Sequence, residues 1–399
     1  MTAIKYELAR GWMRFDVVSL ITELAEAKAA VMSLTNTPFQ RSWAEKLQDM
    51  QLKREIAGTS RIEGAEFTEV EFEQALKEST TEELFTRSQK QARAAKLTYQ
   101  WIAELPEDRP IDERLITEIH RRIITGADDD HCPAGQIRND GQNVMFGIPR
   151  HRGAEGGKEC EIAFNGLVKA IQREFQDYDI LIQALSMHYH FASIHPFIDG
   201  NGRTARALEA LVLQRAGLRD SLFIAMSNYY YDEKTQYLNA LSASRALNHD
   251  LTPFLKFGLR GIALQCRRLY EEIKRHLGKA LYKNVMYDLF NRLKNTRKRV
   301  IAERQIKMLN LLLEEDEMLL RDFFHQMYRE YNSLAVPMQA ISRDLTSLLN
   351  IGAVDFVSDK KGTSPTLVIN LDWATRITET KFFEEISKLP KAKTYPFLN

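Results

Sequence analysis

Apolar residues recur every three or four positions along most of the chain, and this spacing predicts amphipathic helices. Segments 15–34 and 41–57 both show the apolar stripe, and a turn-forming Asn-Thr-Pro sequence separates them. The same spacing predicts further helices at 68–78, 82–104, 112–125, 161–175, 178–194, 203–217, 233–247 and 251–277. The predicted fold class is therefore mainly α.

A break in this helical spacing spans residues 128–157, where Gly, Asn and Pro frame the stretch GQIRNDGQNVMFGIP. Residues 137–138 and 143–146 flank Asp140 and Gly141, a dipeptide that favours a tight hairpin turn. We therefore expect an isolated β-hairpin on the helical body.

The end of the chain has its own pattern, which starts after a basic stretch at 294–304. Helices are predicted at 301–314, 318–330 and 338–350, and β-rich runs follow at 354–357 and 366–369. Three helices and a hairpin in this order resemble a winged helix-turn-helix. We therefore expect a helical N-terminal region at 1–110, a helical core at 111–291 and a winged-helix α+β module at 292–399.

The number of basic side chains in this module indicates whether it binds DNA or protein. The helix in the recognition position, 338–349, carries Arg343 as its only basic side chain, and the wing adds Lys360 and Lys361. So few cations form a weak phosphate-binding surface. Protein contact, including a homodimer, is therefore favoured over DNA binding through residues 338–362, and both stay open.

Composition narrows the class of protein. The 399 residues are 44% apolar, which is enough for a core in each of two or three domains, and 55 basic residues balance 54 acidic ones. The three cysteines lie far apart without metal-binding spacing, so we expect free thiols. No segment has the pattern of a signal peptide or a membrane span. We expect a cytoplasmic protein with no membrane partner.

The candidate chemistry lies in residues 195–206, HPFIDGNGRTAR. His195 follows a predicted helix and supplies a base that titrates near neutral pH. The glycine-rich loop then opens the next helix, so that backbone N–H groups and the helix dipole can hold a phosphate. Arg203 and Arg206 are one turn apart and point to the same side, and Asp199 offers a carboxylate for Mg²⁺.

These residue types suit attack on a nucleotide phosphate, and they match all nine specified positions of HPFxDGNGRxxR. This is the signature of the Fic (filamentation induced by cyclic AMP) family, which the chain therefore resembles. The resemblance implies a helical core that transfers AMP from ATP to a Tyr, Ser or Thr hydroxyl of a target protein. Two alternatives stay open: transfer of another phosphate-containing group, and a DNA- or partner-binding regulator whose Fic core only senses a nucleotide.

The resemblance also implies a role for each motif residue. His195 would deprotonate the target hydroxyl, and Asp199 would hold Mg²⁺. Phe197 would anchor the loop. Gly202 stands where relatives that phosphorylate their targets carry lysine, which favours AMP transfer. After the motif helix, Tyr237 is a weaker candidate for stacking on adenine. The nucleotide contacts implied by the motif are Gly200, Asn201, Gly202, Arg203 and Arg206.

In Fic proteins a β-hairpin flap beside the site holds the target segment by strand addition, and the hairpin expected here has the same place in the sequence. The resemblance therefore implies a target-docking flap. The alternative is a plain surface hairpin without a docking role. The residues that would form the flap are Gly135, Arg138, Val144 and Gly147.

A second motif, TSRIEG, lies at the end of an expected helix. Thr59 and Glu63 are one turn apart on one face, and Gly64 is a natural helix cap. This matches the inhibitory pattern of the family, so the helix at about 41–64 is expected to inhibit the site. The resemblance implies that Glu63 pairs with Arg206 and takes the place of the γ-phosphate. In some relatives the same glutamate promotes removal of AMP, and self-modification is open as well.

Overall fold

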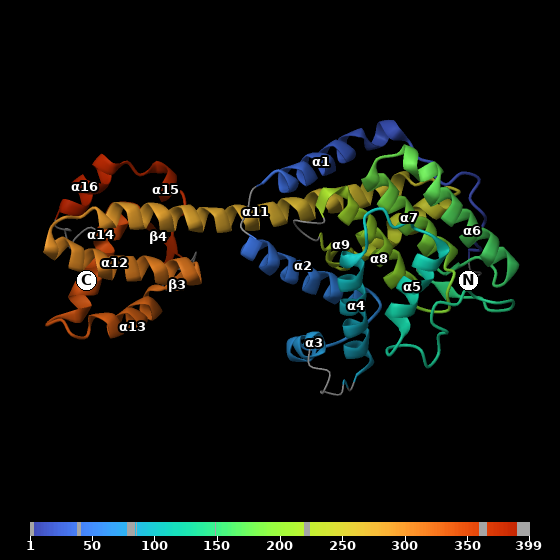
Figure 1. The fold of residues 1–399 in the computed structure, drawn as a ribbon, viewed down its shortest axis with the longest axis horizontal. Helices are drawn as coiled ribbons and strands as arrows, with labels where there is room; N and C mark the ends of the chain where they lie inside the picture. Colours follow the sequence, from blue (N-terminus) through green and yellow to red (C-terminus); the bar gives the residue numbers. More distant parts are fainter. Residues whose placement is uncertain are drawn as a thin grey trace. The chain divides into compact units, whose positions relative to one another are not determined.

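The computed structural model describes residues 4–37, 41–77, 84, 86–147, 149–218, 224–358 and 365–388. The fold is mainly α with two small antiparallel sheets, as the apolar spacing predicts (Figure 1). The chain divides into two compact units, Met1–Tyr270 and Glu271–Asn399. This division lies inside helix α11 (Thr252–Asn291), whereas the change in composition predicts a boundary at the end of that helix.

The first unit is built around helices α7 and α8, which pack against each other. α7 is buried on nearly every side, so it carries no polar face. Figure 1 shows the other helices of the unit around this pair. Besides α11, the helices of the unit are α1 (Val17–Thr35), α2 (Arg41–Ile62), α3 (Glu69–Leu76), α4 (Arg87–Glu104), α5 (Glu113–Ile124), α6 (Lys158–Gln172), η1 (Glu174–Asp177), α7 (Ile180–Ile194), α8 (Asn201–Leu213), η2 (Gln214–Leu218), α9 (Met226–Asp232) and α10 (Lys234–Ala246).

Helix ends in this unit follow local capping chemistry more closely than the apolar stripe. α4 begins later than the spacing predicts, because Thr86 and Gln89 form a capping box in front of it. α2 continues past residue 57 to Ile62, and Gly64 follows with a φ of +91°. A positive φ suits glycine after a helix end, so the predicted role of Gly64 as a cap is confirmed.

The β-hairpin lies later in the chain than we predicted. β1 (Met145–Phe146) pairs with β2 (His151–Arg152) in antiparallel register. The predicted first strand, 137–138, belongs to no sheet, because the backbone N–H of Arg138 donates to the carbonyl oxygen of Pro196 at 2.9 Å. The segment before the Asp-Gly turn is therefore tied to the motif loop rather than to residues 143–146.

The second unit contains helices packed beside a three-stranded antiparallel sheet of order β3-β5-β4. The sequence analysis missed β3, since three residues directly before a helix are too short to show alternation. The two lysines of the predicted wing, Lys360 and Lys361, lie outside the described residues. The elements after α11 are α12 (Thr296–Glu315), β3 (Glu317–Leu319), α13 (Leu320–Tyr331), α14 (Pro337–Asn350), β4 (Val354–Ser358), β5 (Pro365–Ile369), α15 (Trp373–Arg376) and α16 (Glu379–Ser387).

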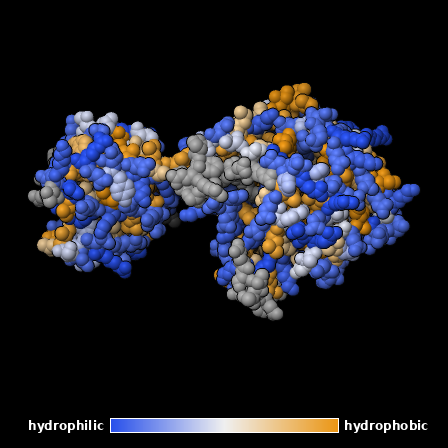
Figure 2. Space-filling view, viewed as in Figure 1, coloured by the Kyte–Doolittle hydropathy of each residue, from blue (hydrophilic) through white to orange (hydrophobic). Residues whose placement is uncertain are grey.

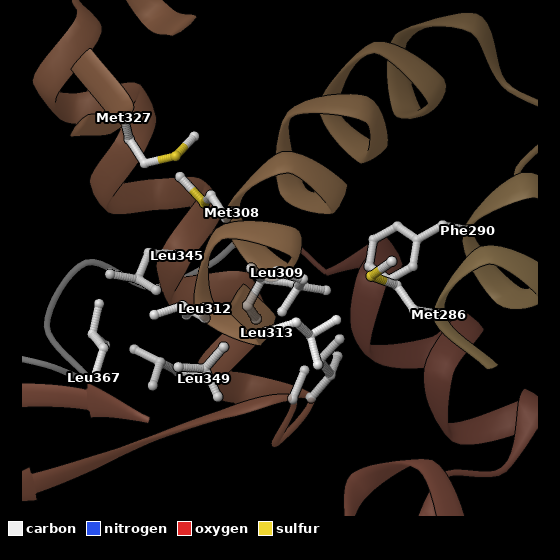
Figure 3. Packing of buried hydrophobic residues seen from close by; sticks show 14 of the residues in the cluster. Met286, Phe290, Met308, Leu309, Leu312, Leu313, Met327, Leu345, Leu349 and Leu367 are labelled. Atoms are coloured by element: carbon white, nitrogen blue, oxygen red, sulfur yellow. The ribbon is translucent and has the colours of Figure 1, made fainter. Parts of the chain in front are cut away.

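A hydrophobic core of its own holds the second unit together (Figure 3). Met286 and Phe290 come from the end of α11, and Leu309 and Leu312 come from α12. Leu345 of α14 belongs to the same cluster. Full burial of side chains of this size contributes about 1.5–3 kcal/mol each, so the C-terminal half of α11 is an integral part of this unit.

The surface seen in Figure 2 is mostly hydrophilic, and apolar residues gather over α1. Val17, Val18 and Ile21 of this helix are exposed. Among the described residues, no helix combines the length and the hydropathy that crossing a membrane requires.

Candidate active site

His195 directly follows α7 in the left-handed backbone conformation, with a φ of 56°. Its Nδ1 lies 3.1 Å from the carbonyl oxygen of Ala192, so this nitrogen carries the proton and Nε2 is left to accept one. Burial, together with the charges of Arg138 and Arg245, lowers the pKa of His195 to about 4. The imidazole is therefore uncharged at neutral pH and can take a proton.

The loop that follows the histidine is fixed by side-chain contacts. Asn201 accepts a hydrogen bond from the N–H of Phe197 at 2.9 Å and donates one to its carbonyl oxygen at 2.8 Å. The buried Phe197 ring stacks on His120 with ring centroids 3.6 Å apart, which agrees with the anchoring position predicted for it. His120 also bonds the carbonyl oxygen of Asp199 at 3.0 Å and the N–H of Gly135 at 2.9 Å. The sequence analysis missed this linking histidine.

The start of α8 offers backbone donors to an anion. Gly200 precedes the helix with a φ of 73°, and no side chain caps the first turn. The first N–H groups of the helix therefore have no partner within it. A Cβ on Gly202 would lie 2.3 Å from Oε1 of Glu63 and 3.1 Å from Nη1 of Arg206, so the backbone approaches both groups closely. An uncapped helix start of this kind favours phosphate groups.

Arg206 connects α8 to the TSRIEG motif of α2. Its Nη2 donates to Oε1 of Glu63 at 2.6 Å, and its Nε donates to Oγ1 of Thr59 at 2.9 Å. The ion pair predicted between Glu63 and Arg206 is thus present. Burial opposes the charged form of both partners, yet the pair keeps the pKa of Glu63 below its usual value and raises that of Arg206.

A group of charged residues surrounds Asp199, and the sequence analysis missed most of them. Oδ2 of Asp199 lies 3.0 Å from Nε2 of His131 and 3.3 Å from Nη2 of Arg87. Asp128 is fully buried and accepts from Nη1 of Arg203 and Nε of Arg87, both at 2.5 Å. Arg203, expected to contact the nucleotide, is therefore ion-paired inside the domain. The acidic run DDDH directly after a predicted helix was the available sequence signal.

Part of this group has the arrangement of metal ligands. Ligand atoms of Asp128, His131 and Asp199 lie within 4.8 Å of one another. Both oxygens of Asp128 are already bonded to arginines, and Mg²⁺ prefers oxygen ligands to imidazole. Of these three residues, Asp199 is therefore the one suited to bind Mg²⁺. Its side chain is 35% exposed, so it can share a cation with phosphate oxygens.

Two of the predicted flap residues belong to the hairpin. Gly147 follows β1 with a φ of 72°, and the carbonyl oxygen of Val144 accepts from the N–H of Gly153 at 3.2 Å. Between them lies Phe146, which the sequence analysis did not single out. Its ring stacks on the imidazole of His195, with centroids 4.0 Å apart and an interplanar angle of 8°. The hairpin therefore contacts the candidate base directly.

The other two predicted flap residues, Gly135 and Arg138, lie outside the hairpin strands and make contacts inside the domain. Arg138 is 1% exposed, and its guanidinium donates to the carbonyl oxygens of His195 at 2.8 Å and Ala154 at 2.5 Å. It holds backbone segments together inside the domain. Gly135 instead bonds His120, and a Cβ there would lie 3.1 Å from the carbonyl oxygen of Thr117.

Tyr237, predicted to stack on adenine, feels the charges of Arg206 and Glu63 and packs among other aromatic side chains, and adenine stacking stays a prediction. The side chain is buried, and its hydroxyl lies 2.9 Å from Nε2 of His188. Its ring stacks on Tyr230 with centroids 4.6 Å apart, and Glu209 accepts from the Tyr230 hydroxyl. Burial raises the pKa of Tyr237 to about 12. Aromatic packing behind α8 encloses the ring.

Comparison with known proteins agrees with the helical fold and the motif. Residues 110–213 match the sequence profile of the Fic/DOC family. The protein adenylyltransferase Fic of Nematostella vectensis is 34% identical over 167 residues, which cover 42% of this chain and 35% of that protein. The protein adenylyltransferase Fic of Culex quinquefasciatus is 30% identical over 145 residues, 36% of this chain and 26% of that protein. The chain thus spans about a third or less of these curated relatives.

Two solved structures have a similar fold. A Fic family protein from Desulfovibrio desulfuricans aligns over 92% of this chain and 98% of its own, with a TM-score of 0.57 and 16% identity. A Fic domain containing signaling protein from Bacteroides thetaiotaomicron aligns over 64% of this chain and 97% of its own, with a TM-score of 0.51 and 20% identity. The match to the Fic/DOC family covers residues 110–213 of this chain, and the two solved structures add a similarity of fold.

Proposed function

We propose that this chain is a protein adenylyltransferase, which transfers AMP from ATP to a hydroxyl group of a target protein. The observation that carries the proposal is the meeting of three groups on one loop and helix. His195 is uncharged with Nε2 free, the first turn of α8 has no cap, and Arg206 is aligned beside that turn. Curated relatives named protein adenylyltransferase Fic support the same reaction.

In the proposed reaction Nε2 of His195 takes the proton of the target hydroxyl as its oxygen attacks the α-phosphorus of ATP. The bond from phosphorus to the pyrophosphate oxygen breaks, and pyrophosphate leaves. The N–H groups at the start of α8 hold the phosphate charge, and Asn201 keeps the loop in shape. Mg²⁺ held by Asp199 would neutralise phosphate charge and stabilise the leaving pyrophosphate.

We also propose that the resting chain is inhibited by its own α2 helix. Two N–H donors of the Arg206 guanidinium are already in use, because Glu63 accepts from Nη2 and Thr59 accepts from Nε. A γ-phosphate needs the same donors, so a carboxylate in that place competes with productive binding of ATP. If Glu63 also assists AMP removal, modified target loses AMP faster with the wild-type chain than with Glu63→Gly.

Intact mass spectrometry tests the proposed transfer. Wild-type, Glu63→Gly and Glu63→Gly/His195→Ala proteins are incubated with ATP and Mg²⁺, alone and with candidate targets. AMP transfer adds roughly 329 Da to the modified chain, and we expect most of it with Glu63→Gly and none with the double variant. A different added mass would assign another phosphate-containing group. ATP binding without any added mass would support the nucleotide-sensor alternative.

For the second unit we propose a winged-helix module that contacts protein, which includes a homodimer. The order α12-β3-α13-α14-β4-β5 with its three-stranded sheet supports this fold. Arg343, the basic residue of α14, is paired with Asp344 at 3.1 Å, which leaves the helix little free charge for a phosphate backbone. Fluorescence anisotropy with a labelled DNA duplex tests the alternative: tight, salt-dependent binding would favour DNA over protein.

A further inference from the structure

A buried arginine, Arg245, lies beside the hairpin and has no carboxylate partner in the part of the chain that the structure describes. Arg245 of α10 is 8% exposed, and its Nη2 donates to the carbonyl oxygen of Arg152 in β2 at 2.6 Å. Its Nε and Nη1 are buried and have no hydrogen-bond partner among the described residues. A buried charge without a counter-ion is costly, so other interactions must offset it.

Aromatic rings supply such interactions. The Arg245 guanidinium carbon lies 5.3 Å from the ring centroid of Phe146 and 5.7 Å from that of Tyr6. Within this range a desolvated guanidinium is attracted to an aromatic ring. Tyr6 belongs to the N-terminal segment, whose Ile4 forms a bridge to His151 of β2. Arg245 therefore joins α10, the N-terminal segment and both strands of the hairpin.

The contact continues from Phe146 to the base. The Phe146 and His195 rings are nearly parallel, at 8° and 4.0 Å between centroids. The bond of Nδ1 to Ala192 fixes one edge of the imidazole, and Phe146 covers one face. Together they leave Nε2 as the free nitrogen in a fixed orientation.

We propose that Arg245 is a positioning residue for the proposed adenylyl transfer, because through Phe146 it holds the imidazole of His195 in the plane that directs Nε2 at the incoming hydroxyl. This role rests on the proposed function of the site. Arg245 touches neither the target nor the phosphates in this arrangement. It acts through the ring that it packs against, and its charge also acts on the imidazole.

The charges that face His195 make the role measurable. They are Arg138 from the loop before the hairpin, Glu63 directly after α2 and Arg245 from α10. Burial and the two arginines lower the pKa of His195, whereas Glu63 and the bond to Ala192 raise it. Loss of Arg245 removes one of the cations and loosens the cover of Phe146, so the pKa of His195 should move up toward its ordinary value of about 6.5.

The test uses the full-length chain with the histidines labelled by ¹³C. NMR titration follows each imidazole, and the His195 signal is the one missing from His195→Ala. We expect Arg245→Met and Phe146→Leu each to raise the pKa of His195 by at least about one unit. Arg245→Lys keeps the charge and should shift it less. Arg267→Met is the control, since Arg267 is 59% exposed and pairs with Glu26 on the surface.

A second measurement follows AMP transfer against pH in the Glu63→Gly background. The acidic limb of the rate profile should move upward by the same amount as the NMR titration, with the Kd of ATP changed less than about twofold. An unshifted His195 titration in both Arg245→Met and Phe146→Leu would overturn the positioning role, even if the rate fell. If Arg245→Met does not fold, the His195 titrations of Phe146→Leu and Arg245→Lys test the positioning role instead.

Failure of the proposed function gives a different result. A shifted titration with no AMP transfer by any variant would reject adenylyl transfer and leave the contact between Arg245, Phe146 and His195 standing. A rate loss that follows only the loss of thermal stability, with no shift of the titration, would assign Arg245 a structural role and overturn the proposal.

Discussion

Arg206 and Glu63, which are 143 positions apart in the sequence, meet at 2.6 Å beside the first turn of α8. Arg206 is 2% exposed, whereas the Glu63 side chain is 33% exposed. The arginine is thus fixed inside the domain, whereas the side chain of the glutamate is partly exposed to solvent. Since Glu63 directly follows the last residue of α2, any movement of α2 changes the charge that Arg206 meets.

The first prediction concerns removal of the carboxylate. Glu63→Gly should raise the rate of AMP transfer at least about tenfold, because loss of about 1.4 kcal/mol of competition with the γ-phosphate corresponds to that factor. Glu63→Gln keeps the size of the side chain without its charge and should activate less than glycine. The measurement is the initial rate of mass gain at saturating ATP. Equal rates for wild type and Glu63→Gly would contradict inhibition by this contact.

The second prediction concerns Arg206 itself. In the Glu63→Gly background, Arg206→Ala should lower the rate about 10²–10³-fold, as expected when a preorganised donor to the charge of the leaving pyrophosphate is removed. The control is Arg267→Ala, because the Arg267 side chain is exposed on the surface. Arg215 is less suitable, because its guanidinium donates to a backbone carbonyl oxygen of the domain. A rate unaffected by loss of Arg206 would mean that ATP is held by other groups.

Much of the site could be predicted because its residues are close in sequence. The loop between α7 and α8 contains His195, Asp199 and Gly200 within a few positions, so the motif alone places them together. The contact of Glu63 with Arg206 was predicted from the family resemblance rather than from spacing. Most helix positions were also predictable, because the spacing of apolar residues indicates which positions are buried.

The rest depends on tertiary contacts that no local pattern encodes. The family resemblance places Arg138 in the frame of the flap, and its guanidinium donates to the carbonyl oxygen of His195 in the motif loop. Phe146 gave no signal, because one aromatic residue in a short strand is as consistent with a core as with a site. Tyr237 packs in an aromatic cluster with His188 and Tyr230.

The third prediction concerns the close packing of α2 on α9. A Cβ on Gly58 would lie 2.5 Å from the backbone nitrogen of Asn228 and 2.5 Å from the carbonyl carbon of Ser227. Gly58→Ala must therefore move α2 away from α9, which loosens Glu63 one turn later. We expect lower stability, by about 1–3 kcal/mol, together with faster AMP transfer than wild type. Urea unfolding and the mass assay measure the two effects.

The matched control for that substitution is Gly11→Ala. A Cβ on Gly11 would meet no atom of the described residues within 4 Å, so the same chemical change should leave both stability and rate unchanged. Faster transfer by Gly58→Ala without faster transfer by Gly11→Ala would tie activation to the position of α2. A destabilised Gly58→Ala protein with the wild-type rate would show that inhibition does not depend on this packing.

The last prediction is that stability falls as pH drops from 7 to 5. Burial lowers the pKa of His120 to about 4 and that of His190 to about 3, so both stay neutral in the folded chain while they bind protons in the unfolded chain below about 6.5. Each then disfavours folding by about 1.4 kcal/mol per pH unit below that value, until the pH approaches its folded pKa. Thermal unfolding across this range measures the fall.

Glu55 works in the opposite direction and provides the internal control. It is buried and accepts from the N–H of Ser227 at 2.7 Å and the hydroxyl of Tyr99 at 2.8 Å, and burial raises its pKa to about 7. A carboxyl group with a raised folded pKa binds a proton in the folded chain first, so it favours folding as pH falls from 7 toward 4.5. Glu55→Gln should therefore steepen the loss of stability with falling pH, and His120→Asn should make it shallower. The same slope in all three proteins would show that these buried groups do not govern the pH dependence.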